Sequence, residues 1–465
     1  MILMEEFIIS SVKDTSNGMQ LCTLLGKTQL QLYSAAIAEP LDIVAIRDSK
    51  SDLQLEAKDI TGKKAGMQDF ESTITTLVSR AEMHPLQKTG IKPLDEALSS
   101  MEEKLTMLAR RIMLSFISGS PIMIRFHNDG DGASGAVALY KAFEKLAKET
   151  RLGTSNCIWT MNKGVAYTLQ SLSYDRLRLS PYHSVIKPLL LITDFGTLEE
   201  SETAIKNAQD SMDIAWLDHH PVYDGFDSGI VHSYVNPWLE GFGSDVTAGA
   251  LTCAVAGMLS GIRVKNLTKA SLLSDHSAYA EDEPEPSELA VIMDAITTDA
   301  SARGSNVTPK NIITTIEDES SYKLVFTQAK SQMDEAVSKG MKYLKARKAG
   351  NATVATLDYS HISENYYGYV RHGRFTSIFS DSVEAKFGPS ITIVYNKSLA
   401  SIRVSKELSE KLRLLSLISK MKEDTDYISN GGGHNEAASV KLEDEYAMSD
   451  FLALLYNEIE SRLDD

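Results

Sequence analysis

Cysteine is scarce in this sequence and forms no recognisable ligand or disulfide pattern. Three cysteines occur in 465 residues, at Cys22, Cys157 and Cys253, and no two of them form a CxxC pair. An odd number of widely separated cysteines excludes a disulfide framework and a zinc ribbon. We therefore predict three reduced thiols in the protein core.

Long apolar runs are also missing. The stretch over residues 251–262 is among the most apolar, and it is shorter than the roughly 20 residues that a helix needs to cross a bilayer. Glu5 and Glu6 stand where a secretory signal would carry basic residues. We expect a soluble, cytoplasmic protein with no membrane partner.

Positive charge is in deficit. The chain has 47 Lys and Arg against 63 Asp and Glu, a formal net charge of −16. This balance argues against binding of nucleic acid by bulk electrostatics, although a local basic groove is compatible with it. Carboxylates that surround divalent cations add to the formal negative count while being neutralised in use.

The chain is long enough for several domains, and its patterns change along its length. Residues 1–66 contain five short β-type segments separated by turn signals, at residues 7–12, 19–25, 29–33, 42–47 and 53–57. This pattern predicts a small OB-like β-barrel, with a β-meander packed on the next domain as the alternative. Residues 67–116 are predicted to be a helical connector, because apolar residues from Leu94 to Ile112 recur every three or four positions.

Residues 117–325 alternate apolar runs with helical patterns. Buried strands are predicted over residues 122–126, 157–161, 189–192, 214–217 and 230–234, and helices over 134–148 and 198–210. The predicted fold class is α/β, with βαβ units that form a doubly wound parallel sheet. Ligands of such sheets bind beyond the carboxyl ends of the strands, so polar residues that directly follow these runs are site candidates.

Residues 326–350 are predicted to be a basic helical linker. Five of the ten residues over 339–348 are Lys or Arg, and they either contact a nucleic-acid backbone or form a solvated helix face. Residues 351–465 form a second, smaller α/β domain. Its strands are predicted over residues 352–357, 391–395 and 399–404, and its closing helix near 447–462.

A dense cluster of metal-ligand residues follows the first strand of the central region. His127, Asp129 and Asp131 lie within five residues, in the segment HNDGDG. A surface Asp-Gly turn is the plain alternative. An EF-hand calcium loop is excluded, because a strand precedes the segment and Tyr140 stands where that loop needs a glutamate.

Two more predicted strands end in residues of the same kind, one in Asp194 and the next in Asp218-His219-His220. A single Asp after a strand is often a helix cap. Three such endings, at one edge of a parallel sheet, are expected to converge. A mixed Asp and His set favours Mn²⁺ over Ca²⁺. A later segment, residues 290–299, offers Asp294 or Asp299 as a further ligand.

A glycine run precedes a histidine near the end of the chain. Gly431, Gly432 and Gly433 can expose amide N–H groups in a nest that holds an anion, and His434 can donate to a phosphate. The alternative for this segment is a flexible loop.

Taken in this order, HNDGDG, ITD, DHH and GGGH resemble the DHH/DHHA1 phosphoesterases, which include RecJ-type exonucleases, nanoRNases and family II inorganic pyrophosphatases. The resemblance covers roughly residues 118–445. Val235-Asn236-Pro237 and Ser401-Ile402-Arg403 also match the family pattern. With its N-terminal barrel and its length, the chain is most similar to archaeal RecJ-like proteins, relatives of the replicative helicase cofactor that works with GINS.

The resemblance implies a two-ion site. His127 and Asp129 would bind one Mn²⁺, Asp194 would bridge both ions, and Asp131, His219 and Asp299 would bind the second, with Mg²⁺ or Co²⁺ as substitutes. Asp299 is preferred over Asp294 because its apolar spacing fits the family. His127 departs from bacterial RecJ-type enzymes, which tend to have Asp there, so the first ion's ligand set can differ.

The resemblance also implies catalytic and substrate-binding residues. Asp218 would orient His219 from outside the ligand set. His220, Arg403 and His434 would face the substrate phosphate, with Asn236 and the glycines Gly431, Gly432 and Gly433 as further substrate contacts.

The implied function is a metal-dependent exonuclease that shortens single-stranded DNA or RNA to mononucleotides, in replication or repair, with GINS as a further partner. One alternative is a replisome scaffold that binds GINS with little catalysis. Another is a phosphatase for short oligonucleotides, cyclic dinucleotides or pyrophosphate. The barrel and the chain length argue against the last, because a small substrate needs no extended binding path.

Overall fold

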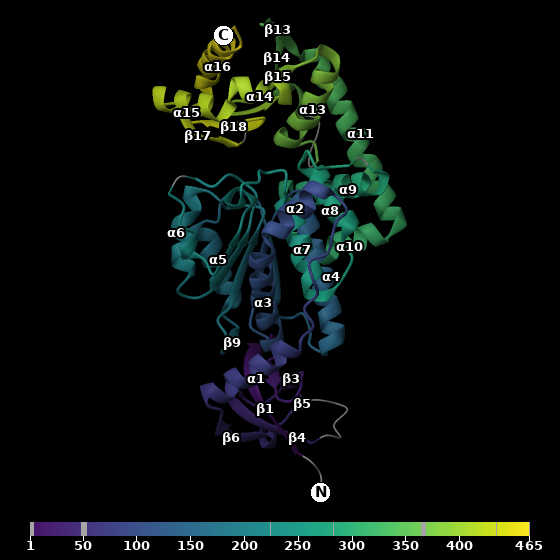
Figure 1. Cartoon of the computed structure of the whole chain (residues 1–465), viewed down its shortest axis with the longest axis vertical. Helices are drawn as coiled ribbons and strands as arrows, with labels where there is room; N and C mark the ends of the chain where they lie inside the picture. Colours follow the sequence, from purple (N-terminus) through teal and green to yellow (C-terminus); the bar gives the residue numbers. More distant parts are fainter. Residues whose placement is uncertain are drawn as a thin grey trace. The chain divides into compact units, whose positions relative to one another are not determined.

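The chain was analysed as a computed structural model, which describes residues 4–47, 54–223, 225–281, 283–363, 369–433 and 435–464. These residues form two compact units (Figure 1). The first comprises residues 1–297 and 306–318, and the second comprises residues 298–305 and 319–465. The second unit therefore takes up its main segment at Glu319, ahead of the predicted boundary at residue 326.

The N-terminal strands form one sheet, which is compatible with the OB-like domain that the sequence predicted. Its strands are β1 (Met4–Asp14), β2 (Gln20–Leu25), β3 (Gln29–Ser34), β4 (Asp42–Arg47), β5 (Gln54–Leu55) and β6 (Ile60–Lys64). They lie in the order β5-β3-β2-β1-β4-β6, with a short 3-10 turn, Ala57–Asp59, before β6. Alternate residues such as Cys22, Leu24 and Leu32 pack inside, as the period-2 pattern requires. Part of the fifth predicted strand lies outside the described residues.

The barrel is joined to the rest of the first unit by strand pairing. A short strand of the next region, β9 (Tyr182–Ser184), pairs antiparallel with β1, with Ser11 opposite Ser184. Lys13 donates to the Ser155 carbonyl at 3.0 Å and lies over the Tyr182 ring. The barrel is thus an integral part of this unit.

The helical connector is three helices, α1 (Met67–Arg80), α2 (Lys92–Ser100) and α3 (Glu102–Ser118). The apolar face predicted over residues 94–112 is divided at Met101, where the backbone leaves helical geometry (φ −98°, ψ 2°). Leu94, Leu98 and Leu105 are nevertheless all buried, because the two helices continue one apolar stripe.

The central sheet confirms the predicted fold class. Its strands are β7 (Ile122–His127), β8 (Cys157–Asn162), β10 (Leu189–Thr193), β11 (Asp213–Leu217) and β12 (Ser233–Val235). All pairings within this sheet are parallel, in the order β12-β11-β10-β7-β8. Helices cover both faces, which explains why β10 is buried along its whole length.

Two layers of helices flank this sheet (Figure 1). Together with α3, the helices are α4 (Gly130–Thr150), α5 (Leu169–Leu179), α6 (Glu199–Ala208), α7 (Ala248–Ser260), α8 (Lys265–Ser274), α9 (Pro284–Ala302) and α10 (Pro309–Glu317). Short 3-10 turns, Ser228–Ile230 and Pro237–Glu240, flank β12. The helices α5 and α6 supply Leu172 and Ile205 to the core on one face. After β7 the chain forms β8 on one side of it and then crosses to form β10 on the other side. The topological switch point of the sheet therefore lies between β7 and β10.

The second unit is built on a mixed sheet in the order β13-β14-β15-β16-β18-β17. The strands are β13 (Lys345–Ala349), β14 (Ala352–Asp358), β15 (Ser390–Tyr395), β16 (Leu399–Val404), β17 (Ile428–Gly433) and β18 (Ala437–Leu442). The helices are α11 (Glu319–Tyr343), α12 (Ser360–Ser363), α13 (His372–Phe387), α14 (Lys406–Leu412), α15 (Leu414–Asp424) and α16 (Met448–Asp464), and a 3-10 turn, Glu445–Ala447, precedes α16.

Two local predictions for this unit were wrong. The basic segment is helical only as far as Tyr343, and residues 345–349 form the edge strand β13. Pairing with β14 overrides the helical pattern there, and the Arg347 guanidinium lies 3.2 Å from the centre of the Tyr456 ring. The glycine run lies in β17, where Gly432 pairs with Ser439 of β18, so it is a strand and not a loop.

The three cysteines are free and buried, as predicted. Among the described residues, no helix is both long and apolar enough to cross a membrane.

Candidate metal centre

Five of the six predicted ligands come together at the switch point of the parallel sheet, namely His127, Asp129, Asp131, Asp194 and His219. His127 is the last residue of β7, and Asp194 directly follows β10, the neighbouring strand. Asp194 has a left-handed backbone conformation (φ +66°), which is uncommon outside glycine and costs on the order of 1 kcal/mol. This conformation turns the chain at the strand end, where open α/β sheets bind their ligands.

His127 and Asp129 form the first part of the centre. The His127 Nδ1 atom contacts Asp129 Oδ2 and lies 3.8 Å from Asp194 Oδ2. Asp129 also caps α4, since its Oδ1 accepts the Gly132 N–H at 3.0 Å. Burial opposes ionisation of Asp129, but the charge of His127 and these hydrogen bonds hold its pKa below the ordinary value.

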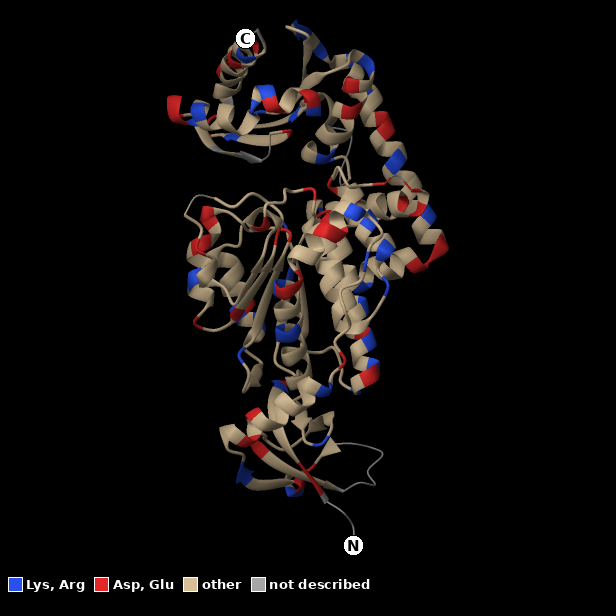
Figure 2. Cartoon of the chain, in the orientation of Figure 1, with Lys and Arg blue, Asp and Glu red and all other residues tan. Residues whose placement is uncertain are grey.

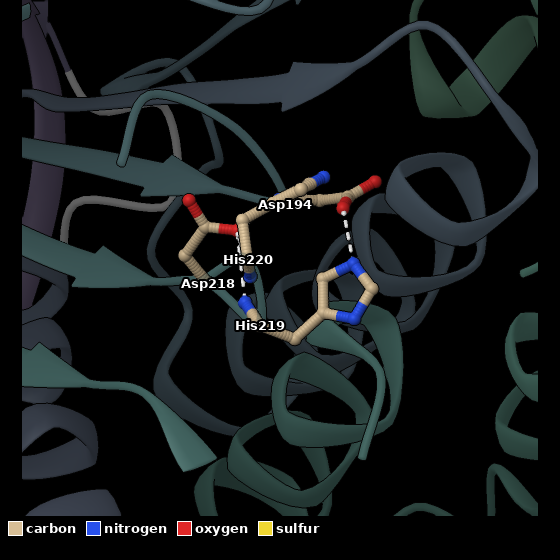
Figure 3. A group of neighbouring side chains, drawn as sticks. All are labelled: Asp194, Asp218, His219 and His220. Carbon is tan, nitrogen blue, oxygen red and sulfur yellow. Dashed lines mark hydrogen bonds and ion pairs between the residues drawn. The ribbon is translucent and has the colours of Figure 1, made fainter. Parts of the chain in front are cut away.

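Asp194 lies at the middle of the cluster and is only 2% exposed. Its Oδ1 is 3.4 Å from His219 Nε2, as Figure 3 shows. Its Oδ2 is buried and has no hydrogen-bond partner among the described residues. Burial, followed by repulsion from Asp129, Asp131 and other carboxylates, raises the pKa of Asp194 well above its ordinary value. Buried carboxylates that repel one another in this way require a cation to be ionised together.

Asp131 is held in place by two neighbouring helices. Its carboxylate accepts the Gly249 N–H of α7 at 3.0 Å and the Ser271 hydroxyl of α8. A Cβ atom at Gly249 would lie 2.5 Å from the Asp131 Oδ1 atom, so only glycine allows this approach. Burial, and next the charges of Asp275 and Asp129 against the opposing effect of His219, raise the pKa of Asp131 to about 6. The sequence patterns did not reveal Gly249 or Ser271.

His219 is buried and presents one ring nitrogen to the cluster. Its Nδ1 donates to the Ser244 carbonyl at 2.9 Å, which places the proton on Nδ1 and leaves Nε2 as the ligand atom. Nε2 faces Asp194 Oδ1 and, at 3.3 Å, Asp275 Oδ2. Although burial acts in the opposite direction, Asp275, Asp131 and Asp218 raise the pKa of His219 to about 9.

The structure gives Asp218 a partner that differs from the predicted one. The Asp218 carboxylate accepts the His220 Nδ1–H at 2.7 Å, and only the backbone N–H of His219. The ring of His219 is oriented by Ser244 instead, because the two imidazoles point in different directions from adjacent residues (Figure 3). Thr197 donates its hydroxyl to Asp218 at 2.5 Å. Although burial opposes it, His220 and these bonds hold the pKa of Asp218 below its ordinary value.

The two residues that the sequence offered for the fourth acidic position, Asp294 and Asp299, fall in different compact units. Asp299 lies in the second compact unit, where its Oδ2 is 2.8 Å from the guanidinium of Arg303, the residue that follows the end of α9. Asp294 lies in the first unit and is buried. Asp275, which the motif analysis passed over, contacts His219 instead. It is the C-cap residue of α8. The helix dipole disfavours a carboxylate at this position, so an aspartate at the end of a predicted helix was the sequence feature that could have indicated a functional role.

Asn236 has a structural position next to the centre. Its side chain donates to the His220 carbonyl at 2.9 Å and to the Tyr234 hydroxyl, and it accepts the Trp238 N–H. These bonds fix the loop that carries His220.

The substrate residues that were predicted in the second unit and are described lie on strands β16 and β17. Arg403 of β16 donates to the Ser377 hydroxyl of α13 at 2.9 Å. Two residues earlier on the same strand, Ser401 contacts His372 Nδ1 at 3.0 Å and Ser439. Gly431, Gly432 and Gly433 lie on β17, which β18 separates from β16, whereas His434 lies outside the described residues.

Two groups of side chains can hold an ion. In each group the ligand atoms lie within 4.8 Å of one another; they are His127, Asp129 and Asp194, and Asp194, Asp218, His219 and His220. Asp194 belongs to both. The unpartnered buried Asp194 Oδ2 and the mixed oxygen and nitrogen donors fit a divalent cation of the Mn²⁺ or Mg²⁺ type. The chain is thus a doubly wound α/β protein with a cluster of carboxylate and imidazole side chains at its switch point that could hold a metal ion.

Known proteins agree with this class. No protein-family model matches the chain. It is 23% identical to the uncharacterized protein MJ1198 of Methanocaldococcus jannaschii, over 87% of this chain and 60% of that protein, so it spans less than two thirds of that relative's length. It superposes on the DHH domain of PF0399, described as a member of the s1p family of ribosomal proteins, with a TM-score of 0.70 and 21% identity, over 85% of this chain and 97% of the other.

A second solved structure, RecJ from Thermus thermophilus in complex with Mn²⁺, matches with a TM-score of 0.48 and 17% identity, over 82% of this chain and 56% of RecJ. The similarity to PF0399 is the stronger one. The chain therefore has the fold of the DHH-domain proteins, which confirms the resemblance drawn from its motifs.

Proposed function

We propose that this chain is a metal-dependent phosphodiesterase that shortens single-stranded nucleic acid from an end and releases mononucleotides. The observation that carries the proposal is the position of Asp194, which two groups of ligand side chains share at the switch point of the sheet. A carboxylate with one oxygen toward His127 and the other toward His219 can bridge two cations. Two adjacent divalent ions supply Lewis-acid stabilisation of the attacking and leaving oxygens of a phosphodiester.

The proposed ligand set follows the contacts. His127 and Asp129 would hold the first ion, and Asp131, His219 and Asp275 would hold the second. Asp275 takes the place proposed from sequence for Asp299, because it alone of the two contacts His219. Mn²⁺ is the proposed metal, with Mg²⁺ or Co²⁺ as substitutes.

Asp218 and His220 form the proposed proton-handling pair. The His220 side chain is 41% exposed, and Asp218 fixes its Nδ1–H. This hydrogen bond sets the tautomer and orients the opposite ring nitrogen for the substrate phosphate or the leaving oxygen.

In the second unit, Arg403 is the proposed contact to a phosphate of the substrate, together with His434 and the glycines of β17. The planar guanidinium is suited to a phosphate, and Ser377 holds it in position from α13. The OB-like barrel, fixed to the first unit by β9, is proposed to bind single-stranded nucleic acid. GINS remains a proposed partner.

The first test is hydrolysis of an end-labelled 30-residue single strand, as RNA and as DNA, in the presence of Mn²⁺. RNA is included because the similar PF0399 domain is described with ribosomal proteins. Stepwise shortening by the wild type, lost in Asp194→Asn and retained in the exposed control Asp210→Asn, supports the proposal. Hydrolysis of dinucleotides alone points to a phosphatase for short substrates, and no hydrolysis of either length rejects the enzyme.

A further inference from the structure

A cavity of about 370 Å³ lies in the first unit, away from the metal centre. It is enclosed by α4, the start of α8, α9 and α10, and its walls include Val137, Leu267, Leu289, Ile313 and Ile316. This volume is within the range of small-molecule sites, which combine apolar walls with a few polar groups.

Three exposed cations are among the residues that line this cavity. Lys141, Arg263 and Lys265 line it, with Glu285 as the one lining carboxylate. None of the three cations has an ion pair within 4.0 Å among the residues that the structure describes. Glu281 forms its ion pair with Lys269, which lowers the pKa of this carboxyl; the charge of Lys265 makes only a smaller contribution in the same direction. Such a concentration of unpaired positive charge is unusual in a chain of net charge −16, and it indicates an anionic ligand.

The backbone adds to the positive potential. The helix α8 begins at Lys265 beside the cavity, and Val264 at its N-cap offers no side-chain hydrogen bond to the first turn. The N–H groups of that turn therefore remain available to an anion. Figure 2 shows Lys and Arg gathered in the part of the first unit where Figure 1 labels α8 and α10.

The lining also indicates what the anion is attached to. The apolar walls would gain nothing from inorganic phosphate, so the ligand has an apolar or heterocyclic body as well as its charge. The Asn266 amide and Glu285 can hydrogen-bond to a polar edge of that body. No aromatic side chain is among the lining residues described, which disfavours a path for stacked bases of a long strand.

We propose that this cavity binds a nucleoside monophosphate, with its phosphate on Lys141, Arg263 and Lys265 and its base against the apolar walls. The cationic cavity stands on its own observations, whereas the choice of a nucleotide rests on the proposed function, of which nucleoside monophosphates are the products. The site shares two helices with the metal centre. Lys141 lies ten residues beyond Asp131 on α4, about 15 Å along the axis, and α8 runs from the cavity to Ser271 and Asp275.

The test is equilibrium binding of AMP to the full chain in EDTA, which keeps the metal centre empty and prevents hydrolysis. We expect AMP to bind, and adenosine and inorganic phosphate each to bind at least tenfold more weakly. Arg263→Ala and Lys141→Ala are expected to weaken AMP binding at least tenfold by loss of a charge-assisted contact. Lys148→Ala, an exposed cation further along α4 that does not line the cavity, should leave it unchanged.

A second variant tests the apolar part of the cavity. Ile316→Trp adds volume to the half-buried wall without removing charge, and is expected to weaken AMP binding while thermal unfolding shows a folded protein. No AMP binding by the wild type, equal binding by Arg263→Ala, or equal affinity for phosphate and AMP overturns the proposal. Because no turnover is involved, a nuclease that fails this test and an AMP-binding chain without nuclease activity are distinguishable outcomes.

Discussion

The His219 Nε2 atom lies 3.3 Å from the Asp275 carboxylate, which joins the end of β11 to the C-terminal end of α8. On this contact, we propose Asp275 as the fourth acidic residue of the candidate metal centre. If the assignment is right, Asp275→Asn lowers affinity for Mn²⁺ by at least tenfold, because an amide is a weaker ligand for a divalent cation than a carboxylate. Calorimetric titration with Mn²⁺ measures this, and Asp299→Asn is the matched variant, expected to bind as the wild type does. The reverse pattern would restore Asp299 as the ligand.

Asp194 should have opposite effects on metal binding and on the stability of the metal-free protein. Without a cation, its buried carboxylate is repelled by its neighbours, so Asp194→Asn is expected to raise the free energy of unfolding in EDTA by on the order of 1 kcal/mol. With Mn²⁺ present, the wild type should be the more stable protein, because only it binds the ions tightly. Thermal unfolding with and without Mn²⁺ shows both effects. A variant that is less stable in both conditions contradicts the repulsion described for this site.

Asp218→Asn separates proton handling from metal binding. Loss of the carboxylate that fixes the His220 tautomer is expected to lower kcat on the order of 100-fold. The affinity for Mn²⁺ should change much less, because Asp218 is not among the proposed ligands. Comparing kcat with a Mn²⁺ titration of the same variant decides this. Equal losses in both would instead place Asp218 in the ligand set of the second ion.

The second unit should lose stability in mild acid through His372. Burial, and next the charge of Arg403, lower the pKa of His372 to about 4. The unfolded chain, with an ordinary histidine pKa of about 6.5, takes up the proton first as the pH falls. Stability is therefore complete above about pH 6.5 and declines toward pH 4, by up to about 3 kcal/mol.

Unfolding of the full chain between pH 7 and pH 4.5 measures the slope, and His372→Gln should reduce it. His183→Gln, a change at a more exposed histidine, is the control. An unchanged slope in His372→Gln assigns the acid sensitivity to other groups.

Gly119 is expected to be essential for attachment of the barrel. Its φ is +70°, and a Cβ atom there would lie 2.1 Å from Thr23 Oγ1 and 2.5 Å from Ser11 Oγ. Gly119→Ala should destabilise the protein by about 2 to 4 kcal/mol through backbone strain and overpacking. Gly18 has a similar φ of +78°, and a Cβ atom there would have nothing within 4 Å. Gly18→Ala should therefore lower the free energy of unfolding through backbone strain alone, by about 1 kcal/mol. Urea unfolding of both variants isolates the packing contribution, and equal losses contradict it.

The sequence by itself determined the parts of this protein that depend on local pattern. Short β-type segments separated by turn signals predicted the N-terminal strands, and apolar runs ending in His127, Asp194 and Asp218-His219-His220 predicted a parallel sheet with ligand-type side chains at one edge. These features can be predicted from sequence because the two-residue repeat of a strand and the geometry of a parallel sheet follow from the backbone itself.

Only the tertiary structure decided which distant groups meet. Asp275 joins the centre because α8 packs on α4 and brings its C-terminal end to His219, and no spacing along the chain records that contact. Asp218 pairs with the ring of His220, and Ser244 with that of His219, since side-chain direction is set by the packing around each residue. Likewise, β13 is a strand because its backbone forms hydrogen bonds with β14. This pairing outweighs the helical propensity of the basic segment.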